Sequence, residues 1–224
     1  MKISPKGIIL FFVVVLPTLL FIFLKFYGVN YYDLPVYYEN GIDSVAFDCG
    51  NQKEQHVVAN FSFTSHDGKS VEETFLEEKI TIVNFFYTKC GIPCDDENEE
   101  LSRIYNFYKD YSNFQILSVS LNPKEDSLAL INSYARSQKR NQVQWYFVRG
   151  ETSETYNFVN CGVVIKLSKD KFGIPFTSQM VLVDGQKIIR GYYDATNRSD
   201  IDRLIREVSI LESNVETNDT PSDD

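Results

Sequence analysis

Hydrophobic and polar positions follow a few regular patterns along this chain, and each pattern predicts an element. Residues 79–87 are almost continuously apolar, which is typical of a strand buried on both faces. Apolar residues then recur at helical spacing from Leu101 to Tyr108, so we expect an amphipathic helix over residues 95–111. Apolar and polar residues alternate on either side of a Ser-His-Asp-Gly turn, which predicts a short hairpin at 61–71.

The rest of the pattern supplies further strands and helices. The predicted strands cover 114–121, 145–148, 180–183 and 187–193. One predicted helix carries Leu128, Ile131 and Ala135 on a single face, and a second, final helix covers 201–211. This order of elements predicts an α/β fold with a central mixed β-sheet flanked by helices.

The N-terminus carries a different signal. Residues 7–24 form an unbroken run without a charged residue, and this run is nearly long enough to cross a bilayer as a helix. A cleaved signal peptide is the alternative, but no small-residue cleavage site follows the run. Because Lys2 and Lys6 precede it, we expect residues 1–6 in the cytoplasm and a single transmembrane anchor at 7–27 in the cell inner membrane. The following domain is then periplasmic.

Composition limits the number of domains and the kinds of partner. The chain has 224 residues, of which 43% are hydrophobic, so it fits one domain with appendages. Its net charge of -9 disfavours nucleic acid as a partner, because phosphate groups would be repelled. We expect a tether at 28–55, a globular domain at 56–212 and a disordered acidic tail at 213–224.

The chemistry depends on very few residues, since the chain has 4 Cys and 2 His. Cys90 and Cys94 flank Gly-Ile-Pro between a buried strand and a helix, a place where α/β sheets position their sites. At this spacing the two sulfurs can form a structural disulfide, exchange with partner thiols, or hold one soft metal ion such as copper(I). The helix N-terminus favours a thiolate. A run of acidic residues opposes it, and this run comprises Asp95, Asp96, Glu97, Glu99 and Glu100.

The other cysteines and the histidines are less informative. Cys49 and Cys161 could form a second disulfide that pins the tether to the domain, and a resolving cysteine or two free thiols are the alternatives. His56 and His66 have the sequence surroundings of exposed loop histidines rather than metal ligands.

The order of several motifs resembles that of the Sco/SenC family. They are Phe-Phe-Tyr-Thr-Lys-Cys90-Gly-Ile-Pro-Cys94, Leu-Ser-Val-Ser-Leu-Asn-Pro-Lys-Glu-Asp126, Tyr134-Ala, Trp145, Leu182-Val-Asp-Gly and Arg190-Gly-Tyr-Tyr-Asp. The resemblance implies a membrane-anchored thioredoxin-like fold that helps to assemble the copper centre of cytochrome c oxidase. It also implies that copper is held by Cys90, Cys94 and one downstream histidine. Counting back from Asp184 places Phe176 or Thr177 at the position of that histidine, so the third ligand is missing.

Two functional hypotheses therefore stay open, with an inert structural bridge as a third. In the first, the protein is a metallochaperone that binds copper(I) through Cys90 and Cys94 and delivers it to a cytochrome c oxidase subunit. In the second, it is a thiol-disulfide oxidoreductase that acts on the cysteines of a thiol or copper protein without transferring copper itself.

Overall fold

The chain divides into two units in the computed structural model, residues 1–33 and residues 34–224. The residues that it describes are 5–27, 33–42, 49, 54–138, 143–170 and 173–218. The first unit contains one helix, α1 (Pro5–Tyr27), in which residues 11–23 have described side chains. Over the described residues, no helix has both the length and the apolar character needed to cross a membrane. The helix predicted at the N-terminus is present as α1, and its role as a membrane anchor stays a prediction.

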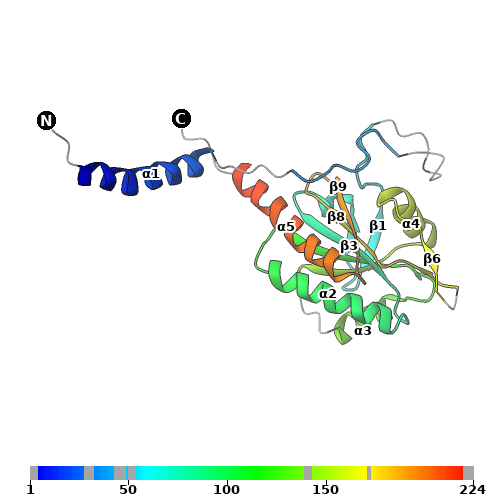
Figure 1. The fold of residues 1–224 in the computed structure, drawn as a ribbon. Helices are drawn as coiled ribbons and strands as arrows, with labels where there is room; N and C mark the ends of the chain where they lie inside the picture. Colours follow the sequence, from blue (N-terminus) through cyan, green and yellow to red (C-terminus); the bar gives the residue numbers. More distant parts are fainter. Residues whose placement is uncertain are drawn as a thin grey trace. The chain divides into compact units, whose positions relative to one another are not determined.

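The second unit is built on a mixed sheet, which confirms the predicted α/β class (Figure 1). Its strands run in the order β2-β1-β5-β4-β3-β8-β9, with β3, β4 and β5 parallel to one another. The strands are β1 (Ser62–Ser65), β2 (Ser70–Glu72), β3 (Ile80–Phe86), β4 (Phe114–Ser120), β5 (Trp145–Arg149), β8 (Gln179–Val183) and β9 (Ile189–Asp194). A separate small hairpin pairs β6 (Ser168–Lys169) with β7 (Pro175–Phe176), and no pattern in the sequence predicted it.

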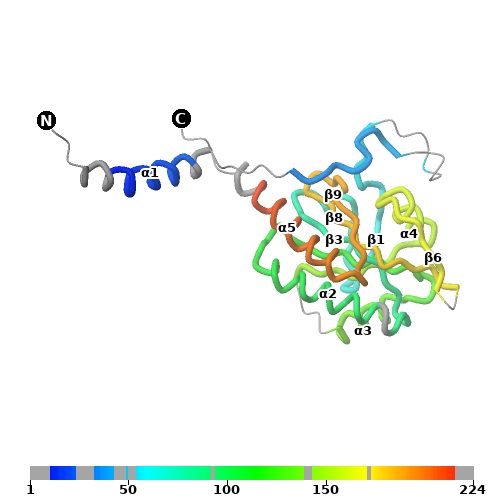
Figure 2. Tube along the Cα trace, in the orientation of Figure 1, coloured from blue at the N-terminus to red at the C-terminus, as the bar shows by residue number. Residues whose placement is uncertain are grey.

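Helices cover both faces of the sheet (Figure 2). Each face has its own apolar core. One core packs beneath α2 (Ile92–Tyr108), α3 (Leu128–Ser137) and α5 (Arg198–Asn218). The other packs beneath η1 (Glu73–Leu76) and beneath η2 (Phe158–Gly162), which directly follows α4 (Thr152–Asn157). Because β3 is central, it supplies Ile82 to the first core and Val83 to the second, as a strand buried on both faces must.

The structure differs from the sequence expectation at two boundaries. The tail predicted as disordered from residue 213 continues α5 as far as Asn218, because helix extension adds a hydrogen bond for each residue once the helix is anchored. Residues 219–224 lie outside the described residues. The predicted tether is partly domain, since Leu34 and Ile42 are buried in the two cores and Arg190 Nη2 donates to the Leu34 carbonyl at 2.9 Å.

Candidate functional site

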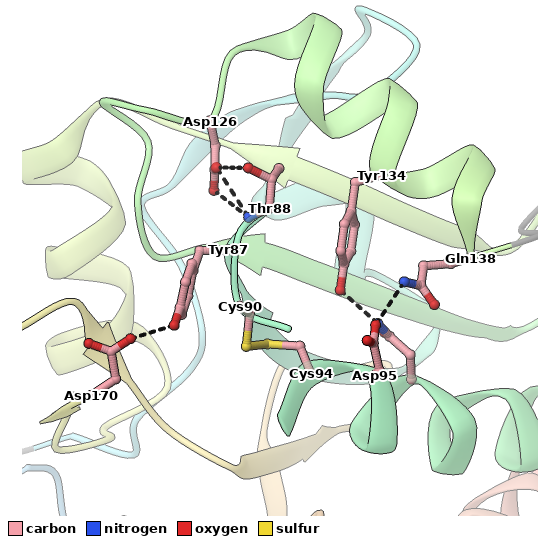
Figure 3. The surroundings of a disulfide bond; sticks show 10 residues. Tyr87, Thr88, Cys90, Cys94, Asp95, Asp126, Tyr134, Gln138 and Asp170 are labelled. Carbon is pink, nitrogen blue, oxygen red and sulfur yellow. Dashed lines mark hydrogen bonds between the residues drawn. A yellow bond between two sulfur atoms is a disulfide. The ribbon is translucent and has the colours of Figure 1, made fainter. Parts of the chain in front are cut away.

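Cys90 and Cys94 are joined by a disulfide at the carboxyl end of β3 (Figure 3). Their Cα atoms are 5.8 Å apart. Cys90 lies in the loop that follows β3 and is half-buried, whereas Cys94 lies in the first turn of α2 and is 2% exposed. Both pack against the core beneath α2. The two cysteines therefore differ in exposure, with Cys90 the more exposed residue and Cys94 the more buried one.

Local backbone geometry explains how four residues bring the sulfurs together. Gly91, which caps α2, has a φ of 73°, a left-handed value that residues with a Cβ atom rarely adopt. Pro93 falls in the first turn of α2, where the missing N–H leaves no hydrogen bond unmade. The chain thus turns sharply after Cys90 and enters the helix, so that the two cysteines face each other.

The Asp126 carboxylate fixes the start of the loop that carries Cys90. This carboxylate is 1% exposed and accepts hydrogen bonds from Thr88 Oγ1 at 2.5 Å, from Thr88 N at 3.2 Å and from Ser120 Oγ at 2.5 Å. It joins the loop of Cys90 to the end of β4 (Figure 3). The sequence placed Asp126 in a motif without assigning it this contact.

A second contact ties the loop to the small hairpin. Tyr87 Oη donates to Asp170 Oδ2 at 2.5 Å, and Asp170 Oδ1 accepts from Ile174 N at 2.8 Å, which closes the turn between β6 and β7. Burial and the negative charge of Asp170 raise the pKa of Tyr87 to about 12, so the phenol stays a donor at neutral pH. The hairpin is therefore fixed beside the cysteine loop.

The hairpin carries the position at which the resemblance implies a histidine. Phe176 in β7 is half-buried and packs against the same core as Cys90 and Cys94. Thr177 is buried, and its hydroxyl accepts a hydrogen bond from Gln179 N at 3.1 Å. An aromatic ring and an engaged hydroxyl offer no imidazole nitrogen. Over the described residues, no three His, Cys, Asp or Glu side chains are grouped to hold a metal ion.

Neither histidine lies at this site. The prediction that His56 is exposed is wrong: it is 4% exposed, and its Nε2 lies 2.6 Å from the Gly162 carbonyl. Burial lowers its pKa despite that hydrogen bond, so the ring is neutral at pH 7. His66 is half-buried in the turn between β1 and β2, against Phe147. Both imidazoles thus belong to other parts of the fold.

Cys49 and Cys161 form the second disulfide, with Cα atoms 5.4 Å apart. It joins Cys49, in the segment predicted as a tether, to η2, next to the Gly162 that His56 contacts. No free cysteine remains among the described residues.

The acidic residues after Cys94 are not equivalent, which the sequence analysis did not recognise. Asp95 is exposed and accepts from Gln138 Nε2 at 3.3 Å, whereas Glu97 is only 3% exposed. Burial, followed by the negative charges of Asp194 and Asp96, raises the pKa of Glu97 to about 8. The available signal was spacing, because Glu97 falls in the same helical stripe as Cys94 and Leu101.

The chain is similar to several known proteins. The family model described as SCO1/SenC matches residues 50–211. A curated relative from Bacillus subtilis, "SCO1 protein homolog", is 20% identical over 168 residues, which cover 71% of this chain and 87% of the relative.

Two solved structures share the fold. Arabidopsis thaliana ScoI with copper bound has a TM-score of 0.59 at 22% identity, and the match covers 70% of this chain and 99% of that one. BsSco, described as having a disulfide switch and as a member of the Sco family of cytochrome c oxidase assembly proteins, has a TM-score of 0.62 at 21% identity. That match covers 70% of this chain and 93% of the other.

Proposed function

The chain belongs to the SCO1/SenC family, and on that premise we propose that it is a thiol-disulfide exchange protein of cytochrome c oxidase assembly that acts through Cys90 and Cys94. Its substrate is a disulfide between two cysteines of a partner protein. The protein reduces this disulfide while its own Cys90–Cys94 pair becomes oxidised to a disulfide. The partner in this proposal is the oxidase subunit whose cysteines will hold copper.

The single observation that carries the proposal is the unequal exposure of Cys90 and Cys94, which pack against the same core as Phe176, a residue whose side chain cannot bind metal. Cys90 is the more exposed of the two cysteines, so we assign its thiolate the attack on a partner disulfide. Cys94 is sheltered and held within bonding distance, so it can resolve the mixed disulfide that results. Phe176 adds an apolar wall rather than a ligand.

Trapping of the mixed disulfide tests this assignment. The reduced full chain is mixed with a synthetic peptide that contains two cysteines joined as a disulfide, and the products are alkylated and mapped by mass spectrometry. We expect the wild type to reduce the peptide and recover the Cys90–Cys94 bond. Cys94→Ser should accumulate a mixed disulfide at Cys90, and the matched variant Cys90→Ser should accumulate none at Cys94.

The outcomes are decisive in either direction. A wild type that leaves the peptide disulfide intact would overturn the exchange function. A mixed disulfide that forms equally well on either cysteine would show that the difference in exposure does not set the order of attack.

Copper(I) binding and delivery is the second candidate, favoured by the thiol pair itself and by family structures that contain copper, such as that of Arabidopsis thaliana ScoI. Two thiolates suit a soft monovalent cation, although the imidazole is missing. An anaerobic copper(I) titration of the reduced chain against a competing chelator tests it. Stoichiometric binding that is lost in a Cys90→Ser, Cys94→Ser variant would favour delivery of copper as cargo.

The location proposed for the domain follows from its cysteines. Two disulfides in one domain persist in an oxidising compartment, so we place the domain on the periplasmic side of the inner membrane. The anchor predicted at residues 7–27 remains part of this proposal, and extraction of membranes with alkaline carbonate tests it.

A further inference from the structure

A cleft lies between α4 and the small hairpin of β6 and β7, and the exchange function gives it no role (Figure 1). Its volume is about 750 Å³, which is enough for a few residues of an extended peptide. One wall is the helical stretch of α4 and η2, and the other is the hairpin with the two residues that precede it. Cys161 belongs to the helical wall, so the disulfide with Cys49 anchors that wall.

The helical wall presents polar side chains to the cleft. Four of its residues line the cleft at positions i, i+3, i+4 and i+7, which lie on one face of a helix. They are Ser153, Tyr156, Asn157 and Asn160. The opposite face packs into the apolar core through Phe158 and Val159. Both asparagines of the wall are exposed, and each amide can donate and accept hydrogen bonds, as the backbone of a bound peptide requires.

The cleft is positively charged, although the protein as a whole is acidic. The chain has a net charge of -9. The described residues that line the cleft include Lys166 and Lys169 and no Asp or Glu. Asp170, which follows in sequence, is bound elsewhere, since it accepts hydrogen bonds from Tyr87 Oη and Ile174 N. An anionic ligand would therefore meet two ammonium groups here, on a molecule whose net charge repels it.

The hairpin separates the cleft from the core on which the cysteine pair packs. Lys169 and Pro175 are paired across β6 and β7, so their side chains lie on one face of the hairpin, and both line the cleft. Phe176 follows and faces the other way, because successive side chains of a strand alternate. It packs against the same core as Cys90. The two faces of the hairpin therefore belong to the cleft and to that core.

A short chain of contacts joins the cleft to Cys90. Asp170, next to Lys169, accepts from Tyr87 Oη, and the Tyr87 carbonyl accepts from Cys90 N at 3.0 Å. Added along these residues and contacts, the path from the Lys169 backbone to Cys90 is at most roughly 20 Å, a span that about six extended residues cover. One peptide segment can therefore reach both places.

From this arrangement we infer that the cleft binds an acidic, extended segment of the partner protein, an inference that rests on the exchange function proposed above. Carboxylates of the segment lie against Lys166 and Lys169, and its backbone groups bind the amides of Asn157 and Asn160. Because the segment continues to the partner's cysteines, its binding holds the partner disulfide near Cys90. The cleft thus raises affinity for the partner and leaves the chemistry of the sulfurs unchanged.

Binding of a labelled peptide tests the cleft apart from the exchange reaction. The probe is a fluorescent peptide of about ten residues that lacks cysteine and carries several Asp and Glu residues, and its matched control carries Asn and Gln instead. Fluorescence anisotropy with the full chain gives both dissociation constants. We expect the acidic peptide to bind at least about fivefold more tightly at low salt, as two exposed ion pairs provide. This preference should disappear in about 1 M salt.

Substitutions of exposed residues locate the binding. Lys169→Gln should weaken binding of the acidic peptide about twofold to threefold, and the Lys166→Gln, Lys169→Gln variant should lose the preference for acidic residues. Asn157→Asp keeps the shape of the side chain and places a carboxylate in the cleft, so it should also weaken binding. Lys109→Gln is the matched control, because it removes the same charge at the far end of α2, and it should bind like the wild type.

The exchange reaction provides the second readout. Two disulfide-bonded peptides are compared as substrates of the reduced full chain, one with acidic residues about three to six positions from a cysteine and one with the corresponding amides. Alkylation and mass mapping follow the formation of the Cys90–Cys94 bond. We expect the acidic peptide to reach its half-maximal rate at about fivefold lower concentration, with an equal maximal rate. The double lysine variant should lose this difference and keep the maximal rate.

The results separate the two proposals. If the acidic and amide peptides bind equally, or if Lys169→Gln and Lys109→Gln behave alike, the binding role of the cleft is refuted while exchange stands on its own test. If binding depends on the cleft but neither peptide disulfide is reduced, the exchange function fails and the cleft remains a site for acidic peptides. A preference in binding without one in the reaction would overturn the delivery of the partner disulfide to Cys90.

Discussion

The two disulfides should differ in how much they stabilise the domain, because they close loops of very different length. Cys49 and Cys161 are 112 residues apart, whereas Cys90 and Cys94 are 4 apart. A cross-link lowers the conformational entropy of the unfolded chain, and this effect grows with the logarithm of loop length. The chain-entropy relation gives about 5 kcal/mol for the long loop and about 2 kcal/mol for the short one at 25 °C.

Urea unfolding of two double variants measures this difference. In one, Cys49 and Cys161 are both replaced by alanine, and in the other Cys90 and Cys94 are, with the remaining disulfide kept oxidised. If the free energy of unfolding falls by about 3 kcal/mol per molar urea, the urea concentration at the midpoint of unfolding should fall by about 1.6 M in the first variant and by about 0.6 M in the second. The second pair can then open and close during use without unfolding the domain.

The reasoning fails if the two variants lose equal stability, or if the Cys90, Cys94 variant loses more. Either result would mean that the bond between Cys49 and Cys161 does not constrain the unfolded chain, and that the two disulfides cannot be divided into a structural one and a working one. Mass mapping of each folded variant before unfolding is the control, because it verifies that the intended bond is the one retained.

Two further substitutions give direct tests. The folded protein keeps a proton on Glu97 that the unfolded chain releases, so stability should fall as pH rises from 4.5 to about 8. Glu97→Gln should remove this dependence of stability on pH, so that at pH 8 its free energy of unfolding exceeds that of the wild type by at most about 5 kcal/mol. Urea unfolding at pH 4.5 and at pH 8 measures this, and a variant with the wild-type dependence on pH would contradict the prediction. Phe176→His should raise the copper(I) affinity of the reduced chain at least about tenfold, or 1.4 kcal/mol, in a chelator competition. Phe176→Leu is its control, and equal affinities for the two variants would show that β7 does not face the bound metal.

The central part of the fold could be predicted because its signals are local and strong. The run at residues 79–87 is apolar on both faces, and it became β3, the strand that supplies both cores. The position of Cys90 and Cys94 followed from it, since a strand that ends immediately before a helix leaves few places for the loop between them. Periodicity fixed the type of element more reliably than its ends, and α5 extends well beyond its predicted range.

Long-range contacts explain what the sequence could not provide. His56 has a polar segment before it, and only the approach of η2 brings the Gly162 carbonyl to its ring. Leu34 looks like part of a linker until Arg190, far along the chain, binds its carbonyl. Asp170 stands among lysines in the sequence, and its contact with Tyr87 depends on a hairpin too short to leave a pattern.

The cysteine loop is fixed by elements that are far apart in sequence, and this bears on which chemistry the site can perform. Asp126 holds one end of the loop from beyond β4, and Asp170 holds Tyr87 from the hairpin that carries Phe176. The hairpin is tied to the loop, and its Phe176 packs against the same apolar core as Cys90 and Cys94. A histidine there would supply a third ligand to copper, whereas a phenylalanine supplies an apolar wall that disfavours charge. With the same scaffold, we propose that the apolar side chain of Phe176 on β7 favours exchange of electrons between sulfurs over retention of a metal.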